Sequence, residues 1–168
     1  TRQWTESNRV HSRIGNIEPS PVELAPGHLL AFCRRAGGYG PGTPGFPGYI
    51  VRAESRDNGR TWTPGIETDF PNPNAAIALL RLTSGNLLLV YNDSLTDRTP
   101  LTAALSTDGG KTFPRRLNLA EGKNDYAYPY LIQSRDGVVH LVYTSQRRST
   151  VNHLSFTEKA LVQSTAQY

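Results

Sequence analysis

The sequence predicts an all-β chain that forms about three four-stranded antiparallel blades of a β-propeller. Two repeated patterns predict this fold. A glycine that opens a short apolar strand recurs at Gly27, Gly85 and Gly137, which are 58 and 52 residues apart. A turn of the form Ser-x-Asp-x-Gly-x-Thr-aromatic occurs twice, and its aspartates, Asp57 and Asp108, are 51 residues apart. Four short strands that recur about every 50 residues are typical of propeller blades.

Each repeat contains short apolar segments separated by turn residues, and no helical period of 3.6 residues is sustained. The first repeat contains PVEL, HLLAFC and YIVRAES, the second AIALLRL, NLLLVYN and LTAALS, and the third YPYLIQS, VVHLVY and VNHLSF. An ordinary β-sandwich also has strands at this spacing. The near-constant period favours the propeller.

The domain organisation that we expect is one partial propeller over residues 1–168, with repeats at about 16–68, 72–118 and 126–165. Propellers typically close with 4–8 blades, so three blades leave an open array. We therefore expect the remaining half of a larger propeller as a partner. The chain begins at Thr1 and contains no methionine, which also predicts a processed chain or a fragment.

Composition narrows the possible ligands. No run approaches the roughly 18 apolar residues of a membrane helix, so we expect no membrane partner. The net charge of +4 comes from scattered arginines rather than the clustered basic runs of nucleic-acid arms. The planar guanidinium of arginine binds carboxylates well, so the excess of arginine indicates an acidic small ligand at least as strongly as nucleic acid. The four histidines lack metal-site spacing, and we expect neither a metal nor another cofactor.

The two Ser-x-Asp-x-Gly turns could hold catalytic or metal-binding aspartates, but a structural role is favoured. Aspartate accepts hydrogen bonds from the backbone of its own turn, and glycine supplies the positive φ. The aromatic residue that follows would pack as an apolar anchor. The residues assigned to this structural role are Ser55, Asp57, Gly59, Thr61, Trp62, Ser106, Asp108, Gly110, Thr112 and Phe113.

Repeat spacing predicts that a group of ionisable residues shares one rim. Glu18 and Tyr128 each lie nine residues before the glycine of their repeat, at the start of the first strand. The first strand of a blade is the innermost, so both residues are expected at one mouth of the channel. The second strand runs antiparallel and returns to the same mouth, where it ends at Arg34.

Loops after the second strands should lie on this same rim. In the second repeat that loop contains Arg98, and in the third it contains Arg147 and Arg148. In the first repeat, residues 36–49 hold six glycines and three prolines together with aromatic residues such as Tyr39. Long loops of this kind often bind ligands, although a plain surface loop is the alternative.

The segments SRDNGRTW and STDGGKTF resemble the Asp-box, or bacterial neuraminidase repeat, of the sialidase (neuraminidase) superfamily. The resemblance covers most of the chain, and it implies a six-bladed propeller of which this chain is similar to the C-terminal half. Pro129 stands where a serine often follows the family's tyrosine, and Thr144 where a glutamate often occurs. The chain looks closest to the predicted-neuraminidase branch of bacterial proteins, which implies a secreted or periplasmic location.

The resemblance also implies site residues. Sialidases clamp the substrate carboxylate with three arginines, and a glutamate assists a tyrosine nucleophile while an aspartate is the acid/base. The segment from Glu18 to Arg34 is similar to the one bearing the glutamate and the second arginine. Arg98 matches the third arginine, and Tyr128 the nucleophile, while the first arginine and the aspartate lie outside this chain. The substrate-binding candidates are Arg34, Arg98, Arg35 and Tyr39.

The activity that the resemblance implies is exo-hydrolysis of sialic acid or a related acidic sugar, with retention. Because the anomeric carbon of a sialic acid bears a carboxylate, a neutral tyrosine avoids the repulsion that a carboxylate nucleophile would meet. A phenol has an ordinary pKa of about 10 and needs a base, for which Glu18 is the candidate. We expect a sialylated or other acidic glycan as the partner. A non-catalytic propeller that binds acidic glycans is the alternative, and nucleic-acid binding is not expected.

Overall fold

The computed structural model describes residues 3–163, which form three antiparallel β-sheets. The first sheet consists of β1 (Asn16–Ala25), β2 (His28–Arg35), β3 (Tyr49–Ser55) and β4 (Ile66–Pro71). The second consists of β5 (Ala78–Arg81), β6 (Leu87–Asn92), β7 (Leu101–Ser106) and β8 (Arg115–Ala120). The third consists of β9 (Ala127–Gln133), β10 (Val138–Ser145) and β11 (Thr150–Thr157), and helix α1 (Glu158–Gln163) follows it.

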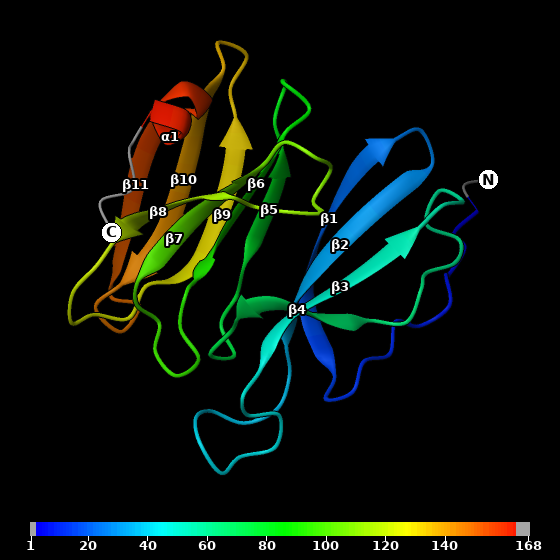
Figure 1. Cartoon of the computed structure of the whole chain (residues 1–168), viewed down its shortest axis with the longest axis horizontal. Coiled ribbons are helices and arrows are strands. Elements are labelled where there is room, and N and C mark those ends of the chain that lie inside the picture. Colours follow the sequence, from blue (N-terminus) through cyan, green and yellow to red (C-terminus); the bar gives the residue numbers. More distant parts are fainter. Residues whose placement is uncertain (1–2, 164–168) are drawn as a thin grey trace.

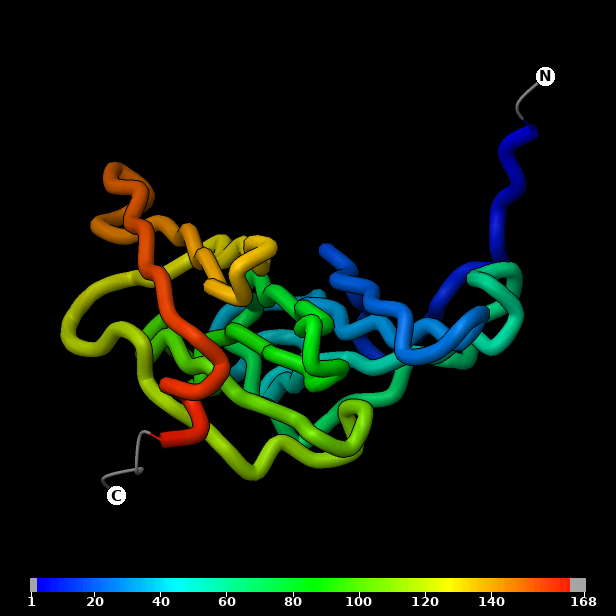
Figure 2. Tube along the Cα trace, turned by 90° about the horizontal axis from the view of Figure 1, so that it is seen from above, coloured from blue at the N-terminus to red at the C-terminus, as the bar shows by residue number. Residues whose placement is uncertain are grey.

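Each sheet is a meander in which consecutive strands pair with each other. The first strands of the sheets lie side by side, because β1 contacts β5 and β5 contacts β9. The sheets follow one another across the molecule from the N-terminal to the C-terminal side (Figures 1 and 2). This arrangement confirms the predicted all-β fold of antiparallel blades, while the number of blades in a closed propeller stays a prediction.

The third sheet differs from the prediction of four strands. In the first two sheets a Ser-x-Asp-x-Gly turn joins the third strand to the fourth. The third repeat has no such turn, since β11 leads directly into Glu158 and the six-residue helix α1. Leu161 of this helix packs into the core, so the helix takes the place of a fourth strand within the described residues.

No helix in residues 3–163 is long and apolar enough to cross a membrane.

Two hydrophobic cores hold the sheets face to face. One core lies between the first and second sheets and includes Phe32, Phe70 and Phe113. The rings of Phe70 and Phe113 meet edge to face, with their centroids 5.2 Å apart. The other core joins the second sheet to the third. Strands β6 and β7 of the middle sheet are therefore buried along their whole length.

The two Ser-x-Asp-x-Gly turns share one hydrogen-bond network. In the first, Asp57 Oδ1 accepts from the backbone N of Thr61 at 2.8 Å, and Oδ2 accepts from its hydroxyl at 2.6 Å. Asp108 and Thr112 form the same pair of bonds in the second turn. The bonds from Thr61 hold the pKa of Asp57 at about 2, and those from Thr112 lower the pKa of Asp108. The network is the one that a turn-stabilising role requires.

Acid should therefore weaken the fold through these two aspartates. Because folding lowers their pKa from 3.8, their stabilisation is complete above about pH 4 and is lost as the pH falls toward 2. The Asp57→Asn/Asp108→Asn variant should melt about 5 °C lower at pH 7 and lose stability less steeply between pH 4 and pH 2. Circular dichroism melts measure both effects, with Asp97→Asn as the control. The idea fails if the acid slope of the double variant equals that of the unmodified chain.

Candidate active site

Glu18 and Tyr128 occupy equivalent bulges at the start of their strands. Ile17 pairs with Arg34 and Pro19 with Cys33, so Glu18 is the extra residue in β1. The third sheet has the same irregularity around Tyr128 in β9. Both residues have left-handed backbones, with φ of 50° and 52°, and each precedes a proline. Bulges re-aim side chains, and here they leave the Glu18 side chain 43% and Tyr128 45% exposed.

Backbone strain is concentrated on this rim. Seven non-glycine residues of the described chain have positive φ, and one of them, Asn58, lies in the first Asp-box turn. Of the other six, two lie at the start of the inner strands β1 and β9, one lies before the inner strand β5, and three lie in the loop after β10. Strained residues of this kind cluster at functional sites, because the surrounding structure must stabilise them. These six residues are Glu18, Asn74, Tyr128, Gln146, Arg147 and Arg148.

Arg34 is buried at the end of β2 and is held by all three of its guanidinium nitrogens. Nε donates to Asn74 Oδ1 at 2.8 Å, and Nη1 donates to Glu18 Oε1 at 2.9 Å. Nη2 donates to the hydroxyl of Tyr39 at 3.2 Å. These bonds use three of the five N–H groups of the side chain and leave two for a ligand.

The structure places Arg35 apart from the other predicted substrate-binding residues. It is only 1% exposed, and its Nε and Nη1 donate to the carbonyl oxygens of Asn72 and Ala36 at 2.7 and 3.1 Å. A Cβ on Gly48 would lie 1.9 Å from Arg35 Cδ, so the loop after β2 closes tightly over this side chain. Arg35 therefore lies beneath the loop, out of reach of solvent, and only Arg34 faces the rim.

The loop at 36–48 follows β2 and lies at the lower edge of the first sheet in Figure 1. Tyr39 is 63% exposed there, and its hydroxyl contacts Arg34. Asn74 Nδ2 donates to the carbonyl oxygen of Gly37 at 2.7 Å and fixes the base of the loop. The loop thus offers an exposed aromatic ring next to a buried cation.

Tyr128 is flanked by two arginines from neighbouring loops. The Cζ atoms of Arg98 and Arg148 lie 5.7 and 5.8 Å from the centroid of its ring. Asp125 holds the loop after β10 by accepting from the backbone N of Arg147 at 2.6 Å, and its Oδ2 lies 3.8 Å from Arg148 Nη1. The resulting group combines a phenol with two cations.

These two groups meet through Asn74, which the sequence did not identify. Its carbonyl oxygen accepts from Arg98 Nη2 at 3.4 Å, and its side chain accepts from Arg34. Glu18 pairs with Arg34, and no hydrogen bond in the described chain joins it to Tyr128. Asn74 lies before the inner strand β5, and Asp125 lies before the inner strand β9. Both are residue types common in turns, and the sequence near them gave no other indication of a role in the site.

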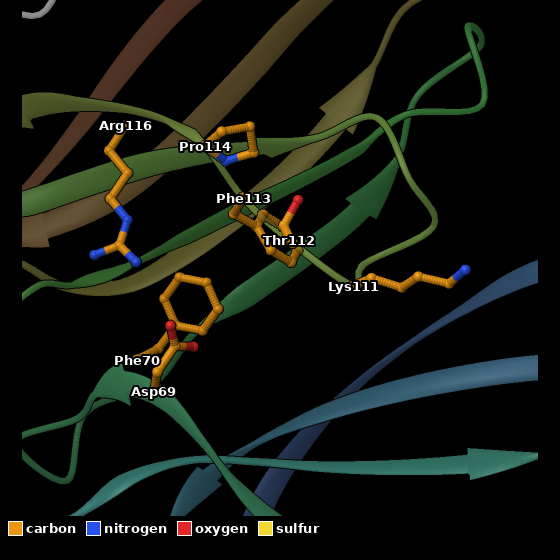
Figure 3. Close-up of a pocket in the computed structure, with 7 residues that line it drawn as sticks. All are labelled: Asp69, Phe70, Lys111, Thr112, Phe113, Pro114 and Arg116. Atoms are coloured by element: carbon orange, nitrogen blue, oxygen red, sulfur yellow. The ribbon is translucent and has the colours of Figure 1, made fainter.

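Two hollows differ in their relation to this rim. One follows the inner strands β1, β5 and β9 and has Glu18 among its lining residues. The pocket in Figure 3 lies between the first two sheets, where Arg116 Cζ is 4.9 Å from the ring centroid of Phe70. Arg116 also pairs with Asp93 at 3.5 Å. The pocket in Figure 3 is lined by none of the rim residues. We therefore place the candidate site at the rim.

Other reactive residues lie outside the candidate site. Cys33 is buried, and burial raises its pKa to about 11, so it packs as an apolar residue. His140 and His153 stack on the exposed face of the third sheet, with their ring nitrogens 3.1 Å apart. No group of three or more potential metal ligands occurs within residues 3–163.

Solved structures share this fold. The Hadza microbial sialidase Hz136 is 25% identical, with a TM-score of 0.67 over 86% of this chain and 28% of that protein. The intramolecular trans-sialidase from Ruminococcus gnavus is 18% identical, with a TM-score of 0.69 over 86% of this chain and 33% of that one. An α-L-arabinofuranosidase from Fusarium graminearum is 19% identical, with a TM-score of 0.61 over 88% and 47%. The chain therefore has the fold of glycoside hydrolase propellers.

The chain spans about a quarter to a third of the length of the two sialidase-type proteins. No curated protein sequence matches it. The model of the BNR repeat-like domain matches residues 1–141, which include both Asp-boxes and the rim residues through Tyr128. The chain belongs to the BNR repeat-like family, within the sialidase superfamily of β-propellers.

Proposed function

We propose that this chain supplies three blades of a larger propeller that hydrolyses sialic acid, or a related acidic sugar, from the end of a glycan. The observation that carries the proposal is the meeting of Arg34, Arg98 and a strained Tyr128 on one rim. Arg34 comes from the first sheet, Arg98 from the second and Tyr128 from the third. A sugar placed at this junction would contact all three blades.

The two arginines suit a carboxylate. Arg34 has two free N–H groups, and Arg98 Nη1 is buried without an acceptor in the described chain. Charge-assisted hydrogen bonds to a carboxylate are about twice as strong as neutral ones, and a planar guanidinium can donate two in parallel. Arg98 has no carboxylate partner within the described residues, and a neutral sugar would leave it without one. The arrangement therefore favours an acidic ligand.

Tyr128 and Glu18 would perform the chemistry. The phenol oxygen would attack the anomeric carbon, and a glycosyl-tyrosine intermediate would form as the leaving group departs with a proton from the acid/base. Glu18 now pairs with Arg34 at 2.9 Å. A substrate carboxylate would compete for Arg34 and so release Glu18 to take the phenol proton. Water would then release the sugar with its configuration retained.

The acid/base aspartate and a further arginine would come from additional blades. The middle sheet is covered on both faces, whereas the third sheet exposes apolar residues on one face. Tyr130, Ile132 and Val151 are 69%, 54% and 74% exposed there. Another blade packed on this face would bury them, as the third sheet buries the second. The greater length of the similar proteins supports the same conclusion.

A non-catalytic propeller that binds acidic glycans is the second candidate. The pairing of Glu18 with Arg34 rather than with Tyr128 favours it. Both candidates use the same arginines, and they differ only in whether the bound sugar is cleaved. Turnover by the complete protein therefore separates them.

The test compares this 168-residue chain with the complete protein on fluorogenic aryl glycosides. We expect the complete protein to hydrolyse an α-sialoside and to leave an arabinofuranoside intact. The chain alone should be inactive, because three blades cannot surround the sugar. Hydrolysis of the arabinofuranoside instead would overturn the acidic-sugar proposal. Turnover by the chain alone, above a Tyr128→Phe control, would show that these blades already form a complete site.

A further inference from the structure

We infer that Asn74 is a positioning residue that fixes both arginines of the proposed carboxylate clamp. The inference rests on the proposed function, because it assigns Asn74 a part in binding the same acidic sugar. It starts from three hydrogen bonds made by one residue. Asn74 contacts Arg34 of the first blade, Arg98 of the second and Gly37 of the loop after β2.

The side-chain amide of Asn74 can take only one orientation. Oδ1 accepts from Arg34 Nε at 2.8 Å, while Nδ2 donates to the carbonyl oxygen of Gly37 at 2.7 Å. A flipped amide would face the arginine with a donor and the carbonyl with an acceptor, and both bonds would be lost. Asn74 is only 5% exposed, so water could not replace them. The amide thus links the clamp to the loop.

The backbone of Asn74 supplies the third contact. Its φ of 58° lies in the left-handed region, which asparagine tolerates better than most residues. In this conformation its carbonyl oxygen accepts from Arg98 Nη2 at 3.4 Å. An asparagine therefore meets two requirements at once, a left-handed backbone and a side chain that both donates and accepts.

Fixing both guanidinium groups lowers the cost of binding. Each free arginine side chain has many rotamers, and a ligand that orders them loses affinity. With Asn74 in place, the N–H groups that face the rim are oriented before the sugar arrives. Removing the amide should therefore weaken the binding of acidic ligands by about tenfold, because the ligand must then order the Arg34 side chain itself.

The variant Asn74→Gly tests this role because glycine keeps the left-handed backbone and removes only the amide. The matched control is Asn58→Gly, which makes the same change at φ 60° in the first Asp-box turn, on the opposite face. Both variants are made in the complete protein. Calorimetry then measures the Kd of an acidic sugar and of its carboxylate-reduced analogue. Hydrogen exchange, followed by NMR, reports on the Nε–H of Arg34.

For Asn74→Gly we expect the Kd of the acidic sugar to rise about tenfold and the Kd of the carboxylate-reduced analogue to stay unchanged. The Nε–H of Arg34 should exchange faster. Asn58→Gly should change none of these. The inference is overturned if Asn74→Gly binds the acidic ligand as the unmodified protein does, or if both ligands weaken equally. If the unmodified protein shows no preference for the acidic ligand, the proposed function fails. The exchange of Arg34 Nε–H then decides separately whether Asn74 positions this arginine.

Discussion

Replacing Arg98 by lysine in the complete protein should weaken the binding of an acidic sugar by about 10- to 1000-fold. Lysine keeps the positive charge but loses the planar fork that donates two hydrogen bonds in parallel. One terminal nitrogen of Arg98 donates to the carbonyl oxygen of Asn74, which leaves the other for a ligand, whereas lysine has a single terminal nitrogen. Isothermal calorimetry measures the effect directly.

The carboxylate-reduced analogue is the control ligand for this experiment, and its affinity should change little. Arg135→Lys is the control variant, because Arg135 is exposed in the turn between β9 and β10, at the far end of the sheet. Equal losses for both ligands would mean that Arg98 supports the fold of its loop. The acidic-sugar proposal would then lose its strongest support.

Tyr128→Phe should lower kcat by at least about 1000-fold, since removal of a nucleophile leaves only residual catalysis. The affinity for a non-hydrolysed ligand should barely change. Phenylalanine keeps the ring that Arg98 and Arg148 contact, so the site should hold its shape. Steady-state kinetics on an aryl sialoside, together with calorimetry, separate the two effects.

Tyr130→Phe is the matched control, because Tyr130 lies two residues further along β9 and is 69% exposed. It should keep nearly full activity. If Tyr128→Phe retains more than a tenth of the activity, the phenol oxygen is not the nucleophile. Tyr128 would then be an aromatic wall of the site.

Repeat spacing predicted much of the fold and the positions of some residues of the candidate site. The equal distances from Glu18 and Tyr128 to their glycines placed both at strand starts, and the structure shows both as bulges with left-handed backbones. Such positions can be read from the sequence because each blade repeats the same strands. The pairing of Glu18 with Arg34 follows from the return of β2 to the same rim.

The remaining features depend on contacts that no local pattern encodes. Arg34 and Arg35 are adjacent in β2, so their side chains point to opposite faces, and the sequence does not say which face meets the rim. Asn74 lies 40 residues from Arg34, and no sequence pattern indicates that the two side chains meet. Helix α1 replaces a strand because its Leu161 can pack into the core, which depends on the third sheet already being in place.

The proposed mechanism requires a covalent bond between an acidic sugar and Tyr128. A sialosyl fluoride with a second fluorine on the sugar ring tests this requirement. The ring fluorine slows both the formation and the hydrolysis of the glycosyl-tyrosine intermediate. Fluoride is a good leaving group and restores the rate of formation, so the intermediate accumulates. Intact-protein mass spectrometry of the complete protein should show the addition of one glycosyl group, and peptide mapping should place it on Tyr128. Tyr128→Phe should show no addition. Steady turnover without any adduct, or an adduct on Glu18, would contradict the account.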